Sequence, residues 1–155
     1  MKRMALLFGI GALLLTSPAL AQLDPDTDGV GIYFDPCACA NCVDLPEGFH
    51  NAYVLITHPS SEEGVLAWEL AIEWTGPAVV TDYALEGIAL NAEVPPEFAV
   101  GLAEPLSNPY MWPAVVVMTM QIWVQSITEP IDFFIDGIYF HSLPDRVPAY
   151  IPADD

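Results

Sequence analysis

Hydrophobic and polar residues alternate along this chain over short stretches that prolines and glycines separate. After residue 21, no stretch keeps a helical period over a dozen positions, and the segments have the lengths of strands. This pattern is typical of an antiparallel β-sandwich or barrel. The expected strands are Val30–Phe34, Asn51–Thr57, Val65–Thr75, Ala78–Glu86, Phe98–Leu102, Ala114–Gln125, Ile131–Ile135 and Gly137–Ser142.

Residues 65–86 have the clearest alternation, with large apolar side chains between small or acidic ones. The apolar face contains Leu66, Trp68, Leu70, Ile72 and Trp74. Gly76 and Pro77 then interrupt the pattern, which predicts a hairpin with Trp74 opposite Val79. In that register four carboxylates gather on the other face, about 5–8 Å apart. They belong to Glu69, Glu73, Asp82 and Glu86.

Residues 114–125 form the second long strand of the prediction. Both faces of this strand are largely apolar, and Thr119 and Gln121 are the positions expected nearest solvent. A strand that is buried on both faces belongs in the interior of a sheet. We therefore expect it to be a central strand.

The first 21 residues have the pattern of a cleavable secretory signal peptide. Two basic residues precede an apolar run, and a small-x-small cleavage pattern ends at Ala21. The run is shorter than the roughly 20 apolar residues that a membrane-spanning helix needs. We expect a signal peptide over 1–21, an acidic leader over 22–29 and one domain over 30–155. The mature protein is then secreted or periplasmic, without membrane insertion.

The charge of the chain narrows the classes of partner. The sequence has 3 Lys and Arg against 21 Asp and Glu, and a formal net charge of −18. Removal of the signal peptide leaves Arg146 as the one basic residue and a charge of −20. Such a surface repels phosphate backbones and anionic lipids, so we expect no nucleic-acid or membrane-surface partner. A cation, a protein or a polysaccharide remains compatible with it.

The segment 86–106, which ends in PPEFAVGLAEPL, is distinctive, and shorter matches lie at 31–35, 52–56, 68–69 and 148–150. Together these segments resemble a group of uncharacterised exported proteins of environmental bacteria. The resemblance implies an immunoglobulin-like β-sandwich of about seven or eight strands, and export from the cell. It implies no activity and no catalytic residues, because a shared fold does not carry a function with it.

The acidic leader contains a candidate calcium loop. Asp24, Asp26 and Asp28 recur at alternate positions, as carboxylates do in the first half of such a loop. Gly29 would permit the turn, and Asp35 falls at the twelfth position. Against this interpretation, position twelve is Asp rather than Glu, and no helix precedes the loop. The alternative is a solvated leader that binds nothing.

Cys37, Cys39 and Cys42 form a C-x-C-x-x-C cluster. In an oxidising compartment we expect one local disulfide, Cys37–Cys42 or Cys39–Cys42, and one remaining thiol. In a reducing compartment the same thiolates would suit copper(I) or zinc. An intermolecular bridge and free thiols are the remaining alternatives.

The sequence offers little that indicates catalysis. The predicted acidic face has a spacing that glycosidases use, but a flat sheet face has no cleft to raise the pKa of one carboxyl group. Tyr110 and Trp112 lie between prolines in an expected loop and are candidates for ligand contact. We therefore expect a secreted, non-catalytic β-sandwich with a structural or binding role and no cofactor. A calcium- or carbohydrate-binding module is the alternative, and a hydrolase that uses the acidic face is less favoured.

Overall fold

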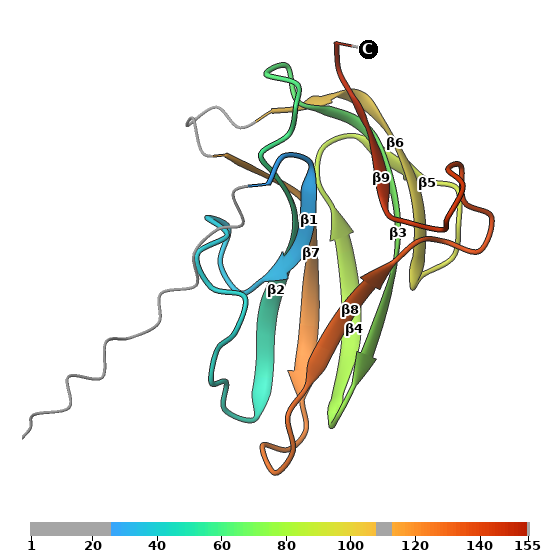
Figure 1. Ribbon diagram of the computed structural model, residues 1–155. Coiled ribbons are helices and arrows are strands. Elements are labelled where there is room, and N and C mark those ends of the chain that lie inside the picture. Colours follow the sequence, from blue (N-terminus) through green and yellow to red (C-terminus); the bar gives the residue numbers. More distant parts are fainter. Residues whose placement is uncertain (1–25, 108–112, 155) are drawn as a thin grey trace, which may run out of the picture.

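The chain folds as a β-sandwich, as the alternation of its residues predicts (Figure 1). The structure is a computed structural model that describes residues 26–107 and 113–154, and these residues form nine strands and no helix. The strands are β1 (Gly29–Tyr33), β2 (Gly48–Thr57), β3 (Val65–Thr75), β4 (Ala78–Leu85), β5 (Ala89–Asn91), β6 (Glu97–Leu106), β7 (Ala114–Val124), β8 (Asp132–Asp136) and β9 (Ala149–Pro152).

The nine strands form two antiparallel sheets. One sheet has four strands in the order β1-β2-β7-β4, and β7 is central, as predicted. The other has the order β5-β6-β3-β8, with β9 also paired to β3. Along one side of β3, β8 pairs with residues 71–75 and β9 with residues 65–69, so these two short strands lie end to end. The chain crosses between the sheets after β2, β3, β4, β6 and β7.

The predicted hairpin between β3 and β4 is wrong. Gly76 and Pro77 join strands of different sheets, because β3 pairs with β6, β8 and β9 whereas β4 pairs with β7. Two strands that each carry an apolar face can bury both faces by packing across the core, so the alternation fits either arrangement. Gly76 has a φ of +88° and lies against the Pro130 carbonyl, which leaves no room for a side chain.

Three details of the strands differ from the prediction. Val65 is fully buried and Leu66 is 37% exposed, because a register shift between Val65 and Ala67 reverses the expected facing. The expected strand over Gly137–Ser142 is absent from the described chain, where turns and bends replace it. The short strands β5 and β9 were not expected. Short edge segments carry too few residues for their alternation to be recognised.

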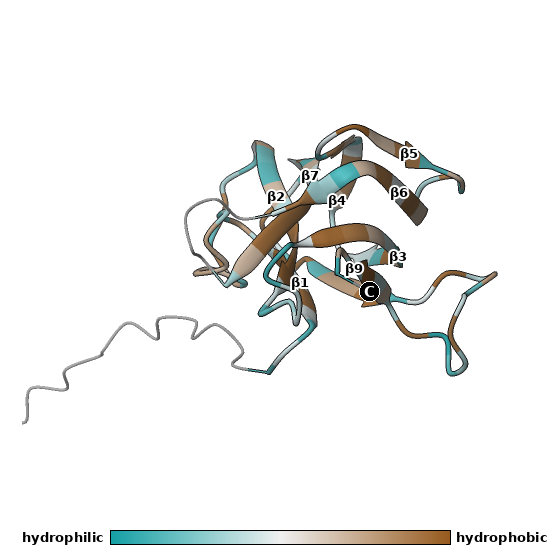
Figure 2. Cartoon of the chain, turned by 90° about the horizontal axis from the view of Figure 1, so that it is seen from above, coloured by the Kyte–Doolittle hydropathy of each residue, from teal (hydrophilic) through white to brown (hydrophobic). Residues whose placement is uncertain are grey.

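The core fills the space between the two sheets. Its largest buried members include Val54 and Ile56 of β2, Trp68, Leu70 and Ile72 of β3, Phe98 and Val100 of β6, and Met118, Met120 and Ile122 of β7. Figure 2 shows long hydrophobic stretches along β3 and β6. A second, smaller cluster of Tyr33, Ala38, Leu55 and Ala114 forms where the loop after β1 folds over the four-stranded sheet.

One lateral side of the sandwich is closed by aromatic contacts. Tyr83 of β4 and Phe98 of β6 meet edge to face, with ring centroids 5.1 Å apart. Phe98 also packs against Trp68 of β3, at a centroid distance of 5.9 Å. Because β4 and β6 belong to different sheets, these rings join the sheets along this side.

Candidate functional site

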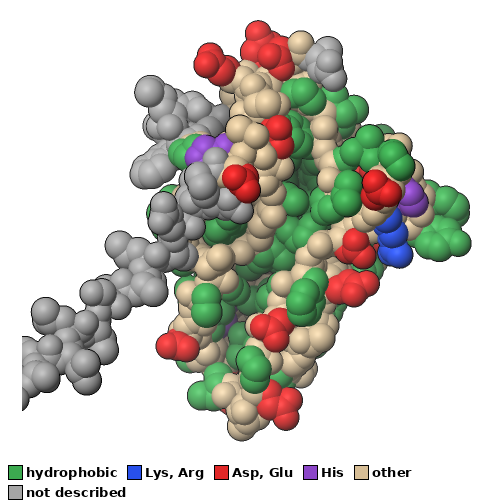
Figure 3. All heavy atoms as spheres, in the orientation of Figure 1, with side chains coloured by type: hydrophobic (Ala, Val, Ile, Leu, Met, Phe, Trp, Pro, Cys, Tyr) green, Lys and Arg blue, Asp and Glu red, His purple; other side chains and the backbone are tan. Residues whose placement is uncertain are grey.

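The opposite lateral side, between β1 and β8, contains an open groove. Two adjoining cavities of about 1090 and 560 Å³ form it, and they share Phe34, Val43, Ile131 and Phe133 as lining residues. Figure 3 shows this side from the front, with hydrophobic side chains in the hollow and acidic side chains around it.

The smaller cavity lies beyond the end of β1, which covers only half of β2. The register of β1 runs along residues 53–57 of β2, and among the described strands only β7 pairs with residues 48–52. A longer β1 would lie beside residues 48–52 of β2, and its inward side chains would approach this end of β7. In its absence, Ile122 and Val124 of β7 line the smaller cavity. The four-stranded sheet therefore lacks half of an edge strand.

The groove combines a hydrophobic interior with an acidic rim. Its interior is lined by Val30, Ile32, Phe34, Ile131, Phe133 and Ile135. Asp44, Glu129 and Asp132 also line it, and all three are exposed. No lysine or arginine is among the lining residues of either cavity. The arrangement suits a ligand that combines apolar groups with positive charge.

A polar cluster of Asp28, Ser60 and Tyr150, here called the latch, joins β1 to β9. The Asp28 carboxylate accepts hydrogen bonds from the Ser60 backbone N–H, at 2.7 Å, and from the Tyr150 hydroxyl. The bond from Tyr150 is the main reason that the pKa of Asp28 lies below its usual value. Partial burial raises the pKa of Tyr150, and the hydrogen bond to the Asp28 carboxylate and its negative charge raise it further. The latch thus holds the start of β1 against the other sheet.

The predicted calcium loop does not form in the described chain. Asp28 and Asp35 lie at opposite ends of β1, a five-residue strand roughly 17 Å long. The Asp28 carboxylate is engaged in the latch, and Asp26 does not join the two in a metal-sized group. Asp24 lies outside the described residues. Residues 29–33, which should curve around the ion, form an extended strand, so Asp28 and Asp35 do not meet around one ion.

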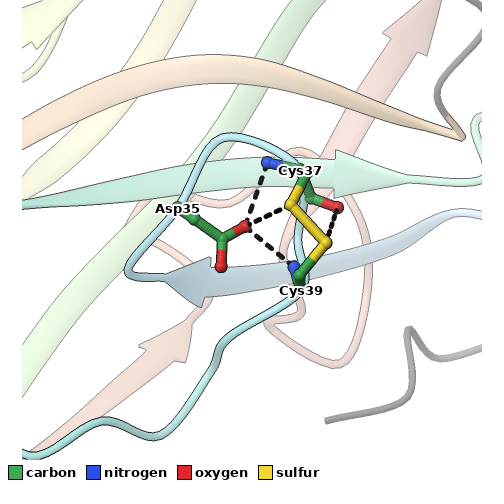
Figure 4. A group of neighbouring side chains, drawn as sticks. All are labelled: Asp35, Cys37 and Cys39. Atoms are coloured by element: carbon green, nitrogen blue, oxygen red, sulfur yellow. Dashed lines mark hydrogen bonds between the residues drawn. A yellow bond between two sulfur atoms is a disulfide. The ribbon is translucent and has the colours of Figure 1, made fainter. Parts of the chain in front are cut away.

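The cysteine cluster contains one local disulfide, but its pairing differs from both predicted pairings (Figure 4). Cys37 and Cys39 are bridged, with Cα atoms 5.3 Å apart, and Cys42 is an exposed free thiol that lines the groove. Asp35 Oδ1 accepts the backbone N–H groups of Cys37 and Cys39, at 3.0 and 2.9 Å, and so folds the loop into a tight turn. This turn brings the two bridged sulfur atoms together.

The same turn bears on the metal hypothesis. Asp35, Cys37 and Cys39 place their ligand atoms within 4.8 Å of one another. A soft metal binds thiolates, and the disulfide leaves neither Cys37 nor Cys39 as a thiolate. The bridged form therefore does not provide the thiolate ligands of a zinc or copper(I) site.

The predicted acidic face does not assemble. Glu69 and Glu73 are on β3, whereas Asp82 and Glu86 belong to β4 and the turn after it, in the other sheet. Glu69 accepts hydrogen bonds from the backbone and hydroxyl of Ser142, at 2.9 and 2.7 Å. Glu86 accepts one from the Thr119 hydroxyl at 3.1 Å. The four carboxylates thus lie in or beside two different sheets, because the hairpin that would have joined them does not form.

An exposed aromatic pair lies on the outer face of the four-stranded sheet. Phe49 and Trp123 have ring centroids 6.0 Å apart and nearly parallel planes, and they are 63% and 43% exposed. Val79 follows Trp123 in the same row across β2, β7 and β4. Asn51 and Gln121 form the next row. Tyr110 and Trp112, the predicted contact residues, lie outside the described residues.

Sequence reasoning missed the groove although it located the two strands beside it. It placed Val30–Phe34 and Ile131–Ile135 in strands, and β1 and β8 correspond to them closely. What it could not supply was their juxtaposition, because about 100 residues separate them and no local signal pairs the edges of two different sheets. The adjacent residues Phe133 and Phe134 were the one indication of a groove in the sequence, since they place a large apolar side chain on each face of β8.

The comparisons with known proteins leave the groove to be interpreted from its chemistry. No family model matches the chain, and neither a curated protein nor a solved structure matches it. Among residues 26–107 and 113–154, no helix has the length and hydrophobicity needed to cross a membrane.

Proposed function

We propose that this protein is a non-catalytic binding protein of the periplasm or the extracellular medium, and that it holds a segment of another protein in the groove between β1 and β8. The single observation that carries the proposal is the groove, where half an edge strand is missing and core side chains line a cavity. We also propose that the sandwich is immunoglobulin-like, on the resemblance of residues 86–106.

Hydrophobic side chains at the mouth of the groove support a binding role. Ile127 is 66% exposed and Val43 is 37% exposed, and both line the cavity beside the missing half-strand. Covering such side chains removes apolar surface from water, which is worth about 25 cal/mol per Å². Connected apolar surface of this kind marks interaction sites on soluble proteins.

The polar groups of the groove favour binding over catalysis. The three carboxylates of its lining are exposed at the rim rather than enclosed with a reacting atom. General acid–base catalysis requires a carboxyl group held within hydrogen-bond reach of substrate, in an environment that tunes its proton affinity. Exposed carboxylates instead attract positive charge over a distance of about 8–10 Å at physiological salt.

The experiment is a selection from a library of random displayed peptides against the folded protein. We expect the selected peptides to bind about tenfold more weakly to a Val43→Ser, Ile127→Ser double variant, because two apolar contacts are lost. The matched control is Ile88→Ser, which removes a hydrophobic side chain that is 75% exposed and lies outside both cavities. Equal binding to all three proteins would place the ligand elsewhere and overturn the proposal.

Carbohydrate binding is a second candidate function, supported by the outer aromatic pair. Phe49 and Trp123 offer exposed rings for stacking on a sugar, and the side chains of Asn51 and Gln121 offer amide donors and acceptors one row away. The test is retention on insoluble polysaccharide, with Trp123→Ala compared with Trp112→Ala. We expect only Trp123→Ala to lower retention. Loss with Trp112→Ala alone would move the sugar site to the predicted loop.

A further inference from the structure

We infer that the groove takes its ligand by β-strand addition, with an extended segment of a partner protein pairing beside residues 48–52 of β2. The inference rests on the proposed function and adds to it the binding mode and the chemistry of the partner. The segment carries hydrophobic residues at alternate positions and Lys or Arg beside them.

The backbone of β2 provides the template for this pairing. Residues 48–52 pair with β7 on one side, from Gly48 opposite Val124 to Ala52 opposite Met120. On the other side the register of β1 stops at Tyr53. In the described chain, no backbone hydrogen bond joins residues 48–52 to a loop. An edge with unpaired N–H and C=O groups accepts a further strand, and its main-chain bonds supply affinity.

The side chains around this edge select an alternating sequence. A strand that continues the line of β1 directs every second side chain inward, as Val30 and Ile32 of β1 already are. Those side chains would reach the cavity of about 560 Å³ that Ile122, Val124 and Phe133 line. Five residues of strand span about 17 Å, so two or three inward side chains fit along residues 48–52.

The charge of the rim selects a basic partner. Asp44, Glu129 and Asp132 line the groove, and neither cavity has a basic residue in its lining. A second copy of this chain is disfavoured, because two molecules of formal charge −18 repel each other. Beyond Arg3, Arg146 is the chain's one Lys or Arg, so a second copy offers a single basic residue against the three acidic ones of the rim. The occupant is therefore a different protein.

The experiment uses a synthetic seven-residue peptide with Val at positions 2, 4 and 6, Thr at 3 and 5, and Lys at both ends. We expect binding by the whole mature protein, and amide hydrogen exchange at least tenfold slower within residues 48–52 when the peptide is bound. The control peptide has the same side chains, but the backbone nitrogens of residues 2–6 are all methylated. It keeps the charge and hydrophobicity and loses the main-chain donors, so we expect no binding.

A pair of charge-reversal variants tests the partner chemistry. Asp44→Lys with Glu129→Lys should weaken the peptide about tenfold at low salt. Glu62→Lys with Glu104→Lys makes the same change in net charge at exposed positions outside both cavities, and it should have a much smaller effect. Equal losses in the two double variants would show attraction by net charge alone and would overturn the assignment of a basic partner to the rim.

Failure of the inference is distinguishable from failure of the proposed function. If library peptides bind in a manner that depends on Val43 and Ile127 while residues 48–52 exchange at unchanged rates, strand addition is wrong and the binding function stands. If sedimentation at 0.5 M salt shows a dimer, and amide hydrogen exchange within residues 48–52 is slowed in that dimer, the occupant is a second copy and the inferred partner is wrong.

Discussion

The two lateral sides of the sandwich are closed by different means. On one side Tyr83, Phe98 and Trp68 bring aromatic rings from both sheets into contact. On the other, the latch of Asp28, Ser60 and Tyr150 joins the sheets at one end of β1, and the groove stays open along β1 and beyond its other end. The same two-layer architecture thus has one side sealed by packing and one side held by a few polar bonds.

The difference follows from the path of the chain after β1. Phe34 donates a backbone hydrogen bond to Ala40, and Asp35 folds the cysteine loop into its turn. Ala38 is thereby buried in the cluster outside the four-stranded sheet. The residues that would have extended β1 along β2 are used to cover the outer face, so the smaller cavity is a consequence of where this loop packs.

The largest expected effect is the loss of the aromatic seal. Phe98 is 1% exposed, so Phe98→Ala should lower the free energy of unfolding by about 3–5 kcal/mol, from lost burial and a cavity. Phe133→Ala, in the partly buried groove lining, should cost less than half of that. Urea denaturation of both variants measures the two costs. Equal costs would mean that the groove is packed as tightly as the sealed side.

Two glycines with positive φ give the next largest contrast. Gly64 has a φ of +105° and its missing Cβ would contact the Leu106 carbonyl, whereas Gly48 has a φ of +130° and nothing within 4 Å. We expect Gly64→Ala to destabilise by about 2–3 kcal/mol and Gly48→Ala by about 1 kcal/mol, since only the first adds a clash to the backbone strain. Thermal melting of both variants is the measurement. A larger loss at Gly48 would show that the start of β2 is not open.

The latch should contribute a smaller, pH-dependent stability. The pKa of Asp28 is lowered in the folded state, so its contribution is present above the unfolded pKa of about 4 and is lost as the pH falls through the folded pKa. Tyr150→Phe should cost about 1 kcal/mol or less at pH 7, because the site is exposed, and less near pH 2, where the bonds between Tyr150 and Ser60 remain. Urea midpoints at both pH values measure this.

The control for the latch is Tyr139→Phe, at a tyrosine that is 66% exposed and outside the latch. It should leave the urea midpoint unchanged at both pH values. If Tyr150→Phe destabilised the protein equally at pH 7 and pH 2, the carboxylate of Asp28 would not be the partner that matters.

The smallest expected effect on stability concerns the free thiol beside the groove. Cys42→Ser should change the free energy of unfolding by less than about 0.5 kcal/mol, because the side chain is exposed. Alkylation of the folded wild-type protein should add one label, at Cys42, and alkylation after reduction should add three. Peptide mass mapping locates the labels. Three labels without reductant would show that the Cys37–Cys39 bridge is absent.

Alternation of side chains allowed the strand content and the sandwich class to be predicted, and it placed residues 114–125 centrally. It failed wherever one strand or one cysteine had to be matched with another. The face with Trp68, Leu70 and Ile72 is equally satisfied by a hairpin to β4 or by packing across the core, so Glu69 and Asp82 were wrongly brought together. The disulfide was mispaired for a related reason, because the turn formed by Asp35 sets which sulfur atoms meet.

By itself the sequence determined the local conformations, because the pattern of burial along a strand is a property of consecutive residues. Only the tertiary structure decided which edges stayed unpaired. That outcome depends on β1 ending at Tyr33 while β2 continues through residues 48–52, and on β8 lying in the facing sheet. Contacts between residues about 100 positions apart are selected by the packing of the whole chain, so the groove between β1 and β8 has no counterpart in any short stretch of sequence.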